Sequence, residues 1–241
     1  SPLPWSALRP PHPAPERALF LGVGTGVTAA SAAADRTLRV DAVELVPEVL
    51  EASAYFERVV PASIDRSRLR LVSADARRFV RTSAEHYDVI VADNFHPARS
   101  GSGSLYTVEH FTSVRDRLAS DGVFCQWLPL HQLDLQTLRS IVRSFVTVYP
   151  RAAALLATHS METPVIGLVA RRDDGPFDLQ QIRSRLANHS LSIELAEFDT
   201  QGDPTLAPGQ FDQYVADEQV LGVVGPAFSG ETDAVLGSLH E

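Results

Sequence analysis

The sequence predicts an α/β fold with a mostly parallel, seven-stranded sheet and helices on both faces. From residue 17 to about residue 170, short apolar runs alternate with amphipathic segments. Strand–helix alternation of this kind implies parallel strands joined by right-handed crossovers. Runs such as ALFL and DVIVA are apolar almost throughout, which is typical of strands that helices cover on both faces.

Each element has its own local signal. Seven segments have the length and apolar content of strands, namely Ala18–Leu21, Val40–Glu44, Leu69–Val72, Tyr87–Ala92, Val123–Leu128, Ala153–Ala157 and Val165–Ala170. Helical periodicity predicts helices at roughly 26–34, 47–58, 75–82, 107–118, 134–147 and 178–187. Asp121-Gly122 predicts the turn into the fifth strand. Pro150 predicts the end of the helix that ends near Tyr149.

Charge is distributed unevenly along the chain. The 241 residues carry 21 basic side chains, all of them arginine, against 30 acidic ones, for a net charge of -9. Residues 187–241 hold ten of the acidic residues and no arginine, so the rest of the chain is nearly neutral. Nothing here builds the basic surface that a nucleic-acid partner requires, so we expect none, and a cationic partner suits the chain better. The lack of lysine excludes a P-loop lysine and a Schiff-base lysine.

Signals for metals and membranes are absent from the sequence. Cys125 is the single cysteine, which excludes an intrachain disulfide and a cysteine-based zinc site. The eight histidines lack ligand spacing, so we expect no metal. No apolar run reaches the roughly 18 residues of a membrane span, and residues 1–16 form a proline-rich arm or linker without a signal layout. We therefore expect a cytoplasmic location.

The turn after the first strand is rich in glycine. It reads Gly22-Val23-Gly24-Thr25-Gly26 and leads directly into the first helix. Glycines let the backbone approach a ligand closely, and a helix N-terminus offers free N–H groups. The spacing G-x-G-x-G differs from the G-x-G-x-x-G of dinucleotide-binding proteins, and simple tight packing is the alternative explanation.

Acidic residues follow the second and third strands. Glu44 ends the second strand, and a carboxylate there can accept hydrogen bonds from both ribose hydroxyls of a nucleoside. Leu45 follows it directly and belongs to the same candidate site. Asp75 and Ala76 follow the third strand, where they are candidates to bind an adenine. A role for Asp75 as helix N-cap is the alternative, and both roles can coexist.

The fourth strand ends at Asp93, at the edge of the sheet where α/β proteins bind ligands. Residues 93–107 predict a long loop that closes over a substrate. Asp93 is the candidate that orients or deprotonates a nucleophile, with Asn94 beside it, and His96 is a candidate second acid or base, unless it is a surface residue. Tyr106 is a candidate to line the pocket or to anchor the next helix.

The fifth strand ends with two more candidate pocket residues. Gln126 and Trp127 are expected to form the far wall of the substrate pocket, beside an acceptor bound at Asp93. The alternative for Trp127 is packing against a neighbouring helix.

The order of the motifs resembles the polyamine aminopropyltransferases, or spermidine synthases. It is most similar to bacterial spermidine-synthase-like domains that are often fused to membrane segments, so a membrane tether on a longer parent chain is one expectation. The resemblance covers about residues 17–170 and rests on LGVGTGVTA, VDAVELVPEV, RLVSADARRFV, YDVIVADNFHP, GSLYTVEHF and DGVFCQWLPLH.

The resemblance implies a class I S-adenosylmethionine-methyltransferase-like Rossmann fold, with a nucleoside-binding catalytic domain at 17–172 and an acidic extension at 173–241 packed on or near it. It assigns Asp93 as the catalytic carboxylate. It implies that the turn glycines form the nucleoside-binding loop, that Glu44 binds the ribose, and that Asp75 and Ala76 bind the adenine. The family's second carboxylate is replaced here by His96, and its glycine-rich turn has Thr25 in place of an Asp.

Three functions are compatible with these features. The first is aminopropyl transfer from decarboxylated S-adenosylmethionine to a small-molecule amine, with Asp93 as the base. The second is a small-molecule methyltransferase that uses S-adenosylmethionine itself, and the third is a non-catalytic nucleoside-binding domain. Neither reaction is expected to require a metal. The resemblance implies a dimer or a tetramer, of which we expect a homodimer.

Overall fold

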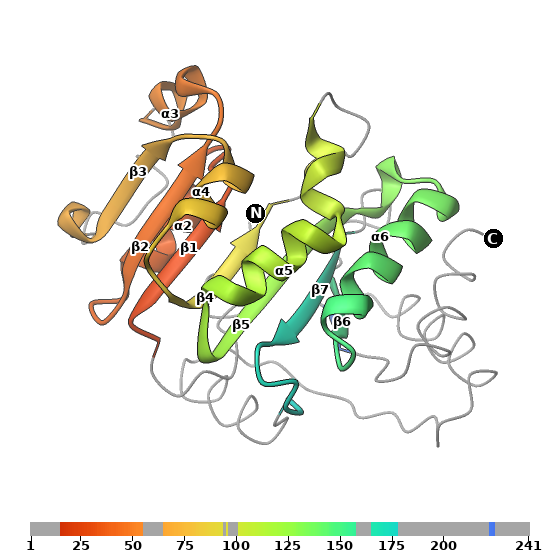
Figure 1. Cartoon of the computed structure of the whole chain (residues 1–241). Helices are drawn as coiled ribbons and strands as arrows, with labels where there is room; N and C mark the ends of the chain where they lie inside the picture. The colour runs from red at the N-terminus through yellow and green to blue at the C-terminus, as the bar shows by residue number, and fades with distance from the viewer. Residues whose placement is uncertain are drawn as a thin grey trace. The chain divides into compact units, whose positions relative to one another are not determined.

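The computed structural model describes residues 15–54, 65–93, 95, 101–157, 165–177 and 222–224 (Figure 1). Contacts divide the chain into two compact units. The first contains Ser1–Asp93, Ser113–Phe124 and Pro176–Glu194, and the second contains Asn94–Thr112, Cys125–Gly175 and Leu195–Glu241. The expected helix at 178–187 lies outside the described residues.

Parallel strands form the centre of the first unit. They are β1 (Arg17–Leu21), β2 (Arg39–Glu44), β3 (Leu69–Ser73) and β4 (Tyr87–Ala92), in the order β3-β2-β1-β4. Leu21 of β1 pairs with Val43 of β2 and with Ala92 of β4, all in parallel. The predicted parallel arrangement is therefore confirmed for these four strands, and their carboxyl ends share one edge.

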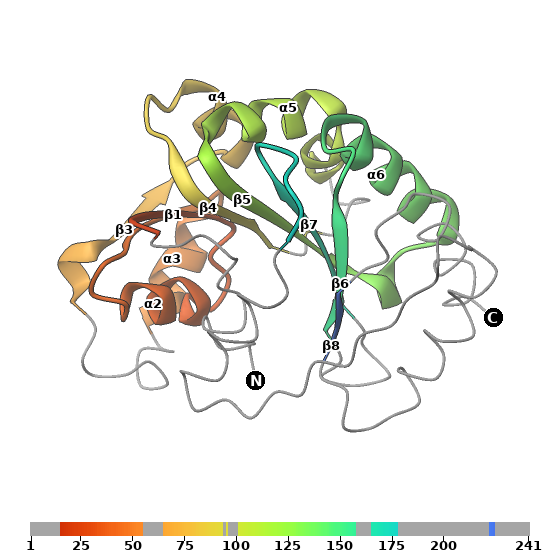
Figure 2. The same ribbon diagram turned by 90° about the horizontal axis from the view of Figure 1, so that it is seen from below.

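Helices cover this sheet on both faces (Figure 2). Helices α2 (Val27–Ala33) and α3 (Pro47–Ser53) lie on one face, and α4 (Ala76–Thr82) lies on the other. Three buried alanines of α2, Ala29, Ala32 and Ala33, let this helix approach the sheet closely. Ala18–Leu21 of β1 are buried at every position, as the apolar run ALFL predicts.

The fifth strand begins earlier than its sequence predicts. Helix α5 (Val108–Arg117) is followed at once by β5 (Leu118–Pro129), so Asp121-Gly122 lies inside the strand rather than in a turn before it. A Cβ atom on Gly122 would lie 2.9 Å from the Tyr87 carbonyl oxygen and 3.0 Å from the backbone of Ala119. The glycine is therefore required by close backbone contact, which the dipeptide alone does not distinguish from a turn.

Antiparallel pairing characterises the second unit, which contains α6 (Leu135–Val148), β6 (Ala153–Ala157), β7 (Val165–Arg171) and β8 (Gly222–Val224). Its strand order is β5-β7-β6-β8, and β6 is antiparallel to both of its neighbours. Residues 158–164 join β6 to β7, which is too short for the crossover of about a dozen residues that parallel neighbours need. The three-residue β8 was not predicted.

Aromatic rings form the core of the second unit. The ring centroid of Phe145 on α6 lies 5.0 Å from that of Phe111 and 5.0 Å from that of Tyr149. All three side chains are fully buried. Helix α6 begins at its N-cap Asp134, whose side chain accepts a hydrogen bond from the Thr137 amide at 2.9 Å.

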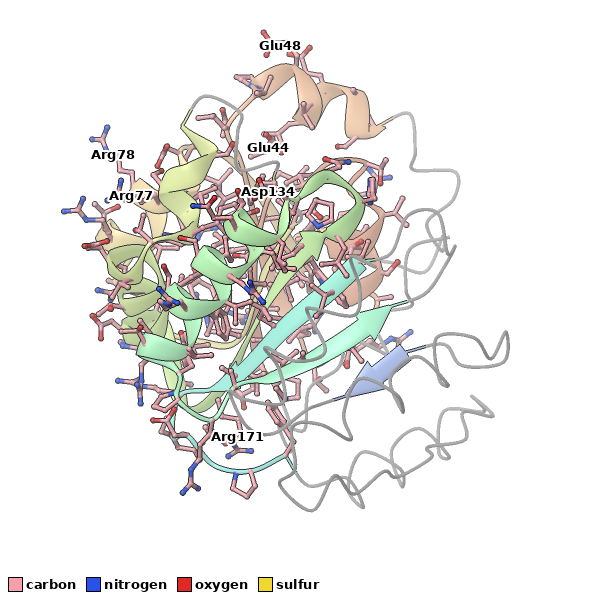
Figure 3. The ribbon with its side chains drawn as sticks, turned by 90° about the vertical axis from the view of Figure 1, so that its right-hand side faces the viewer. Glu44, Glu48, Arg77, Arg78, Asp134 and Arg171 are labelled. Atoms are coloured by element: carbon pink, nitrogen blue, oxygen red, sulfur yellow. The ribbon has the colours of Figure 1, made fainter. Side chains whose placement is uncertain are left out.

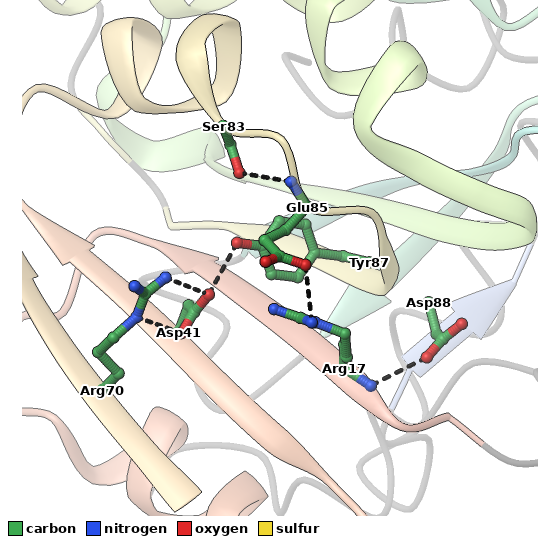
Figure 4. A network of polar contacts seen from close by, with 7 residues as sticks. All are labelled: Arg17, Asp41, Arg70, Ser83, Glu85, Tyr87 and Asp88. Atoms are coloured by element: carbon green, nitrogen blue, oxygen red, sulfur yellow. Dashed lines mark hydrogen bonds and ion pairs between the residues drawn. The ribbon is translucent and has the colours of Figure 1, made fainter.

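A buried carboxylate links the amino ends of the strands in the first unit (Figure 4). Asp41 of β2 accepts two hydrogen bonds from Arg70 of β3, both 2.8 Å long, and one of 2.7 Å from the hydroxyl of Tyr87 of β4. Burial of the phenol, together with its bond to the Asp41 carboxylate, raises the pKa of Tyr87 to about 12. The neutral phenol is thus part of the native packing.

Raising the pH is expected to destabilise the chain through Tyr87. An unfolded tyrosine loses its proton near pH 10. Between pH 10 and about pH 12 the unfolded chain therefore binds fewer protons than the native chain. The contribution of this phenol is complete below pH 10 and falls by about 2 kcal/mol across that window. Urea unfolding of the wild type and of Tyr87→Phe at pH 9, 10 and 11 measures the first half of this loss in stability.

The Tyr87→Phe variant should be less stable at pH 9 and should lose less stability than the wild type as the pH rises. Absorbance titration should show one late-ionising phenol fewer in the variant than in the wild type. An identical pH dependence of the two proteins would contradict the assignment.

Candidate functional site

The candidate site lies where the parallel strands of the first unit end. The ladder continues past these ends, because Gly22 N–H donates to the Val43 carbonyl at 2.8 Å and Asp93 N–H donates to the Leu21 carbonyl at 2.9 Å. The Ala74 N–H donates in the same way to the Glu44 carbonyl at 2.9 Å. These bonds place the turns after β1, β2, β3 and β4 at one edge.

The glycine-rich turn has a backbone that other residues rarely adopt. Gly22, Gly24 and Gly26 have φ angles of 90°, 52° and 76°. The Gly26 N–H closes the turn on the Val23 carbonyl at 2.8 Å, and the Gly26 carbonyl accepts from Ala30 in the first turn of α2. Left-handed backbone at these positions explains the G-x-G-x-G spacing better than packing alone. Thr25, between the last two glycines, is exposed.

Glu44 binds the turns on both sides of it. Its Oε2 accepts a hydrogen bond of 3.1 Å from the Val23 N–H in the glycine turn, and its Oε1 accepts one of 3.1 Å from the Val46 N–H. Figure 3 shows Glu44 at the end of its strand, with Glu48 on the following helix. Each carboxylate oxygen can accept a second hydrogen bond, so the group remains able to bind ligand hydroxyls.

Asp75 caps helix α4. Its Oδ1 accepts a hydrogen bond of 2.7 Å from the Arg78 N–H, which confirms the N-cap alternative. Its Oδ2 accepts no hydrogen bond from the residues that the structure describes. The cap therefore does not exclude a second role at a ligand. Ala76 is the first residue of the capped helix.

Two apolar side chains next to Glu44 are exposed. Leu45 is 63% exposed and Val46 is 43% exposed, although both are large hydrophobic residues. Exposed apolar side chains beside convergent polar groups are typical of a ligand pocket. Leu45 is among the predicted site residues. Val46 was missed, because its contact with Glu44 is made by its backbone N–H, which residue type does not reveal.

Asp93 faces the glycine turn. A Cβ atom on Gly24 would lie 3.7 Å from Asp93 Oδ2, so the turn and the carboxylate are close neighbours. The Asp93 side chain is partly buried. The sequence predicts that both belong to one site, and the structure brings them together with Glu44 within the first unit.

Other predicted site residues belong to the second unit. The buried Tyr106 donates its hydroxyl hydrogen bond to the Phe95 carbonyl, two residues after Asp93 in the chain. This contact fits its predicted alternative role as an anchor. Asn94 and His96 lie outside the described residues, so their candidate roles stay predictions.

Gln126 and Trp127 are both buried in the second unit. The Gln126 side-chain amide donates to the Trp127 carbonyl at 3.1 Å. A Cβ atom on Gly167 of β7 would lie 2.9 Å from the Trp127 ring, so the indole packs on this strand. Their role as a pocket wall stays a prediction. Burial also raises the pKa of the Cys125 thiol beside them.

Among the described residues, no group of three or more His, Cys, Asp or Glu side chains is placed to hold a metal ion. Within the same residues, no helix has both the length and the apolar character needed to cross a bilayer.

Comparison with known proteins identifies relatives for most of the chain. The family described as the spermine/spermidine synthase domain matches residues 10–166. A polyamine aminopropyltransferase of Methanocaldococcus jannaschii is 32% identical over 127 residues, which are 52% of this chain and 43% of that protein. One from Thermotoga maritima is 25% identical over 206 residues, or 78% of this chain and 66% of that protein. The chain thus spans less than two thirds of the length of either relative.

Solved structures share the fold at low sequence identity. A spermidine synthase in complex with the transition-state analogue AdoDATO superposes with a TM-score of 0.64 at 22% identity, over 82% of this chain and 69% of that one. Human methyltransferase-like protein 13 in complex with SAH superposes with a TM-score of 0.60 at 17% identity, over 84% of this chain and 95% of that one. The predicted class I methyltransferase-like fold is confirmed by these likenesses.

The double contact of Glu44 predicts a structural penalty for its neutralisation. Glu44→Gln replaces one acceptor oxygen by an amide NH₂ that would face a backbone N–H donor. We expect a loss of about 1–2 kcal/mol in unfolding free energy, because a charge-assisted hydrogen bond is removed. Urea unfolding measures this loss. Glu48→Gln is the matched control, since Glu48 is exposed and accepts no hydrogen bond in the described part of the chain. Equal losses in both variants would contradict the role.

Proposed function

Because the chain belongs to the spermine/spermidine synthase domain family, we propose that it is a transferase that moves an aminopropyl group from decarboxylated S-adenosylmethionine to a small-molecule amine. The observation that carries the proposal is the position of Asp93. This carboxylate lies beside the glycine turn at Gly24, at the edge where Glu44 also lies. An amine bound at Asp93 would thus meet a nucleoside-bearing donor bound at the turn.

The donor's nucleoside would be bound by the residues of the first unit. The glycine turn would offer backbone N–H groups and allow the backbone to approach the nucleoside closely. The remaining acceptor positions of Glu44 suit the two ribose hydroxyls. Leu45 and Val46 offer exposed apolar surface for the adenine. Asp75 Oδ2 is available to accept from the adenine amino group, with the Ala76 N–H next to it.

The reaction is a nucleophilic substitution at the carbon beside the sulfonium. The amine lone pair forms the new C–N bond while the C–S bond breaks, and its electron pair goes to sulfur. The leaving group is neutral methylthioadenosine, so no metal is needed to stabilise it. The attacking nitrogen gives up one proton, which Asp93 accepts. The protein's main task is to hold the amine unprotonated and in line with the breaking bond.

A methyltransferase that uses S-adenosylmethionine is the alternative. It would use the same nucleoside contacts and the same substitution chemistry. Its supporting observation is the segment Asp93-Asn94-Phe95-His96-Pro97, which carries one carboxylate where the family resemblance expects two. A single carboxylate binds a diamine less strongly than two carboxylates do.

The main proposal, aminopropyl transfer, also includes a cytoplasmic location, a homodimer and a catalytic domain at residues 17–172.

Calorimetric titration with three nucleosides distinguishes these functions. Aminopropyl transfer predicts that decarboxylated S-adenosylmethionine binds more tightly than S-adenosylmethionine and that methylthioadenosine also binds. The reverse order of the first two would support methyl transfer. If none of the three binds to the folded chain, both enzymatic proposals are wrong.

Replacing the proposed base should separate catalysis from binding. Asp93→Asn keeps the shape of the side chain and removes its ability to accept a proton. We expect turnover with an amine acceptor to fall by about 10² or more, with methylthioadenosine affinity nearly unchanged. Asp116→Asn is the matched control, because Asp116 is exposed on α5 and is not one of the candidate site residues. Parallel loss of turnover and affinity in Asp93→Asn would show that Asp93 has a binding or folding role instead.

A further inference from the structure

The opposite edge of the same strands holds a polar cavity. Its volume is about 480 Å³, within the range of small-molecule sites. It lies entirely within the first unit, at the amino ends of β1, β2 and β3. Its lining is almost wholly charged or polar and consists of Arg17, Arg39, Val40, Asp41, Asp65, Ser67, Arg68, Arg70 and Glu85.

Strand register places the arginines of this cavity on one face. Arg17 of β1 pairs with Arg39 of β2, and Asp41 pairs with Arg70 of β3. Paired residues of neighbouring strands point to the same side, as do residues two apart on one strand. Arg17, Arg39 and Arg70 are therefore presented together, around Asp41.

Three of the arginines have acidic partners. Arg70 forms a two-pronged pair with Asp41, Arg17 Nη1 lies 2.7 Å from Glu85 Oε2, and Arg68 Nε lies 3.3 Å from Asp65 Oδ2 (Figure 4 shows the first two). Each pair uses only some of the five N–H donors of its guanidinium. The Arg70 side chain is 59% exposed, so its remaining donors are accessible.

Arg39 differs from the other three. It is exposed and has no acidic partner within the described part of the chain, and it stands beside Arg17 in the register. The cavity lining thus carries four guanidinium groups against three carboxylates. Arg17 and Arg39 are adjacent positive charges, and only Arg17 is paired with a carboxylate, so an anion placed between them would be attracted to both.

We propose that this cavity binds a small organic anion through a phosphate or carboxylate group, with Arg39 as its principal contact and Arg17 and Arg70 beside it. Guanidinium forks match the geometry of both groups and bind them with paired hydrogen bonds. Arg39 and Glu44 are the two ends of β2, which separates the cavity from the nucleoside edge by about 16 Å. The anion and a nucleoside therefore bind at the same time.

Inorganic pyrophosphate and citrate test the proposal as separate phosphate and carboxylate probes. Each is titrated calorimetrically into the wild-type chain and into Arg39→Ala at low salt. At least one probe should bind the wild type, and Arg39→Ala should weaken it about tenfold, because a charge-assisted contact is lost. The probe that binds more tightly identifies the source of the anion.

Arg36→Ala is the matched control, since Arg36 is exposed, lies three residues before Arg39 and is not part of the cavity lining. It should bind the probe as the wild type does, and Arg39→Lys should recover only part of the affinity. When a probe binds to a folded chain, the amide NMR signals of Val40 and Ser67, which line the cavity, should shift. Failure of both probes to bind, equal weakening in Arg36→Ala, or competition by methylthioadenosine would overturn the proposal.

Discussion

The parallel hydrogen-bond ladder around β1 is the constraint on which the first unit depends. This strand is buried and is paired with β2 on one side and β4 on the other. The ladder continues past the strand ends through the N–H groups of Gly22 and Asp93. Because parallel neighbours begin and end together, the turns after the strands meet at one edge and the segments before them meet at the other.

The two edges consequently present opposite chemistry. The carboxyl edge carries the carboxylates of Glu44, Asp75 and Asp93, which suit hydroxyl groups and amines. The amino edge presents an arginine-lined cavity arranged around Asp41, which suits an anion. In each case the site is assembled from short segments that are far apart in the chain, and the buried strands between them keep the two sites separate.

Local signals in the sequence were sufficient for most elements, but they were ambiguous wherever a residue serves two purposes. An aspartate before a helix predicts either a cap or a ligand contact, and Asp75 caps α4 while one of its oxygens remains available. Asp121-Gly122 has the composition of a turn, yet Gly122 lies within β5 because the Tyr87 backbone approaches it too closely for a side chain. Composition cannot distinguish a glycine needed for its φ angle from one needed for space.

The strand–helix alternation, the glycine turn and the acidic residues at the strand ends follow from the sequence alone, because apolar periodicity and turn residues are local properties. The hydrogen bond from the Val23 N–H to Glu44, 21 residues away, and the approach of Gly24 to Asp93 depend on the folded chain. The side-by-side position of Arg17 and Arg39 depends on it as well. Such contacts follow from strand order and register, which long-range pairing sets and local sequence does not encode.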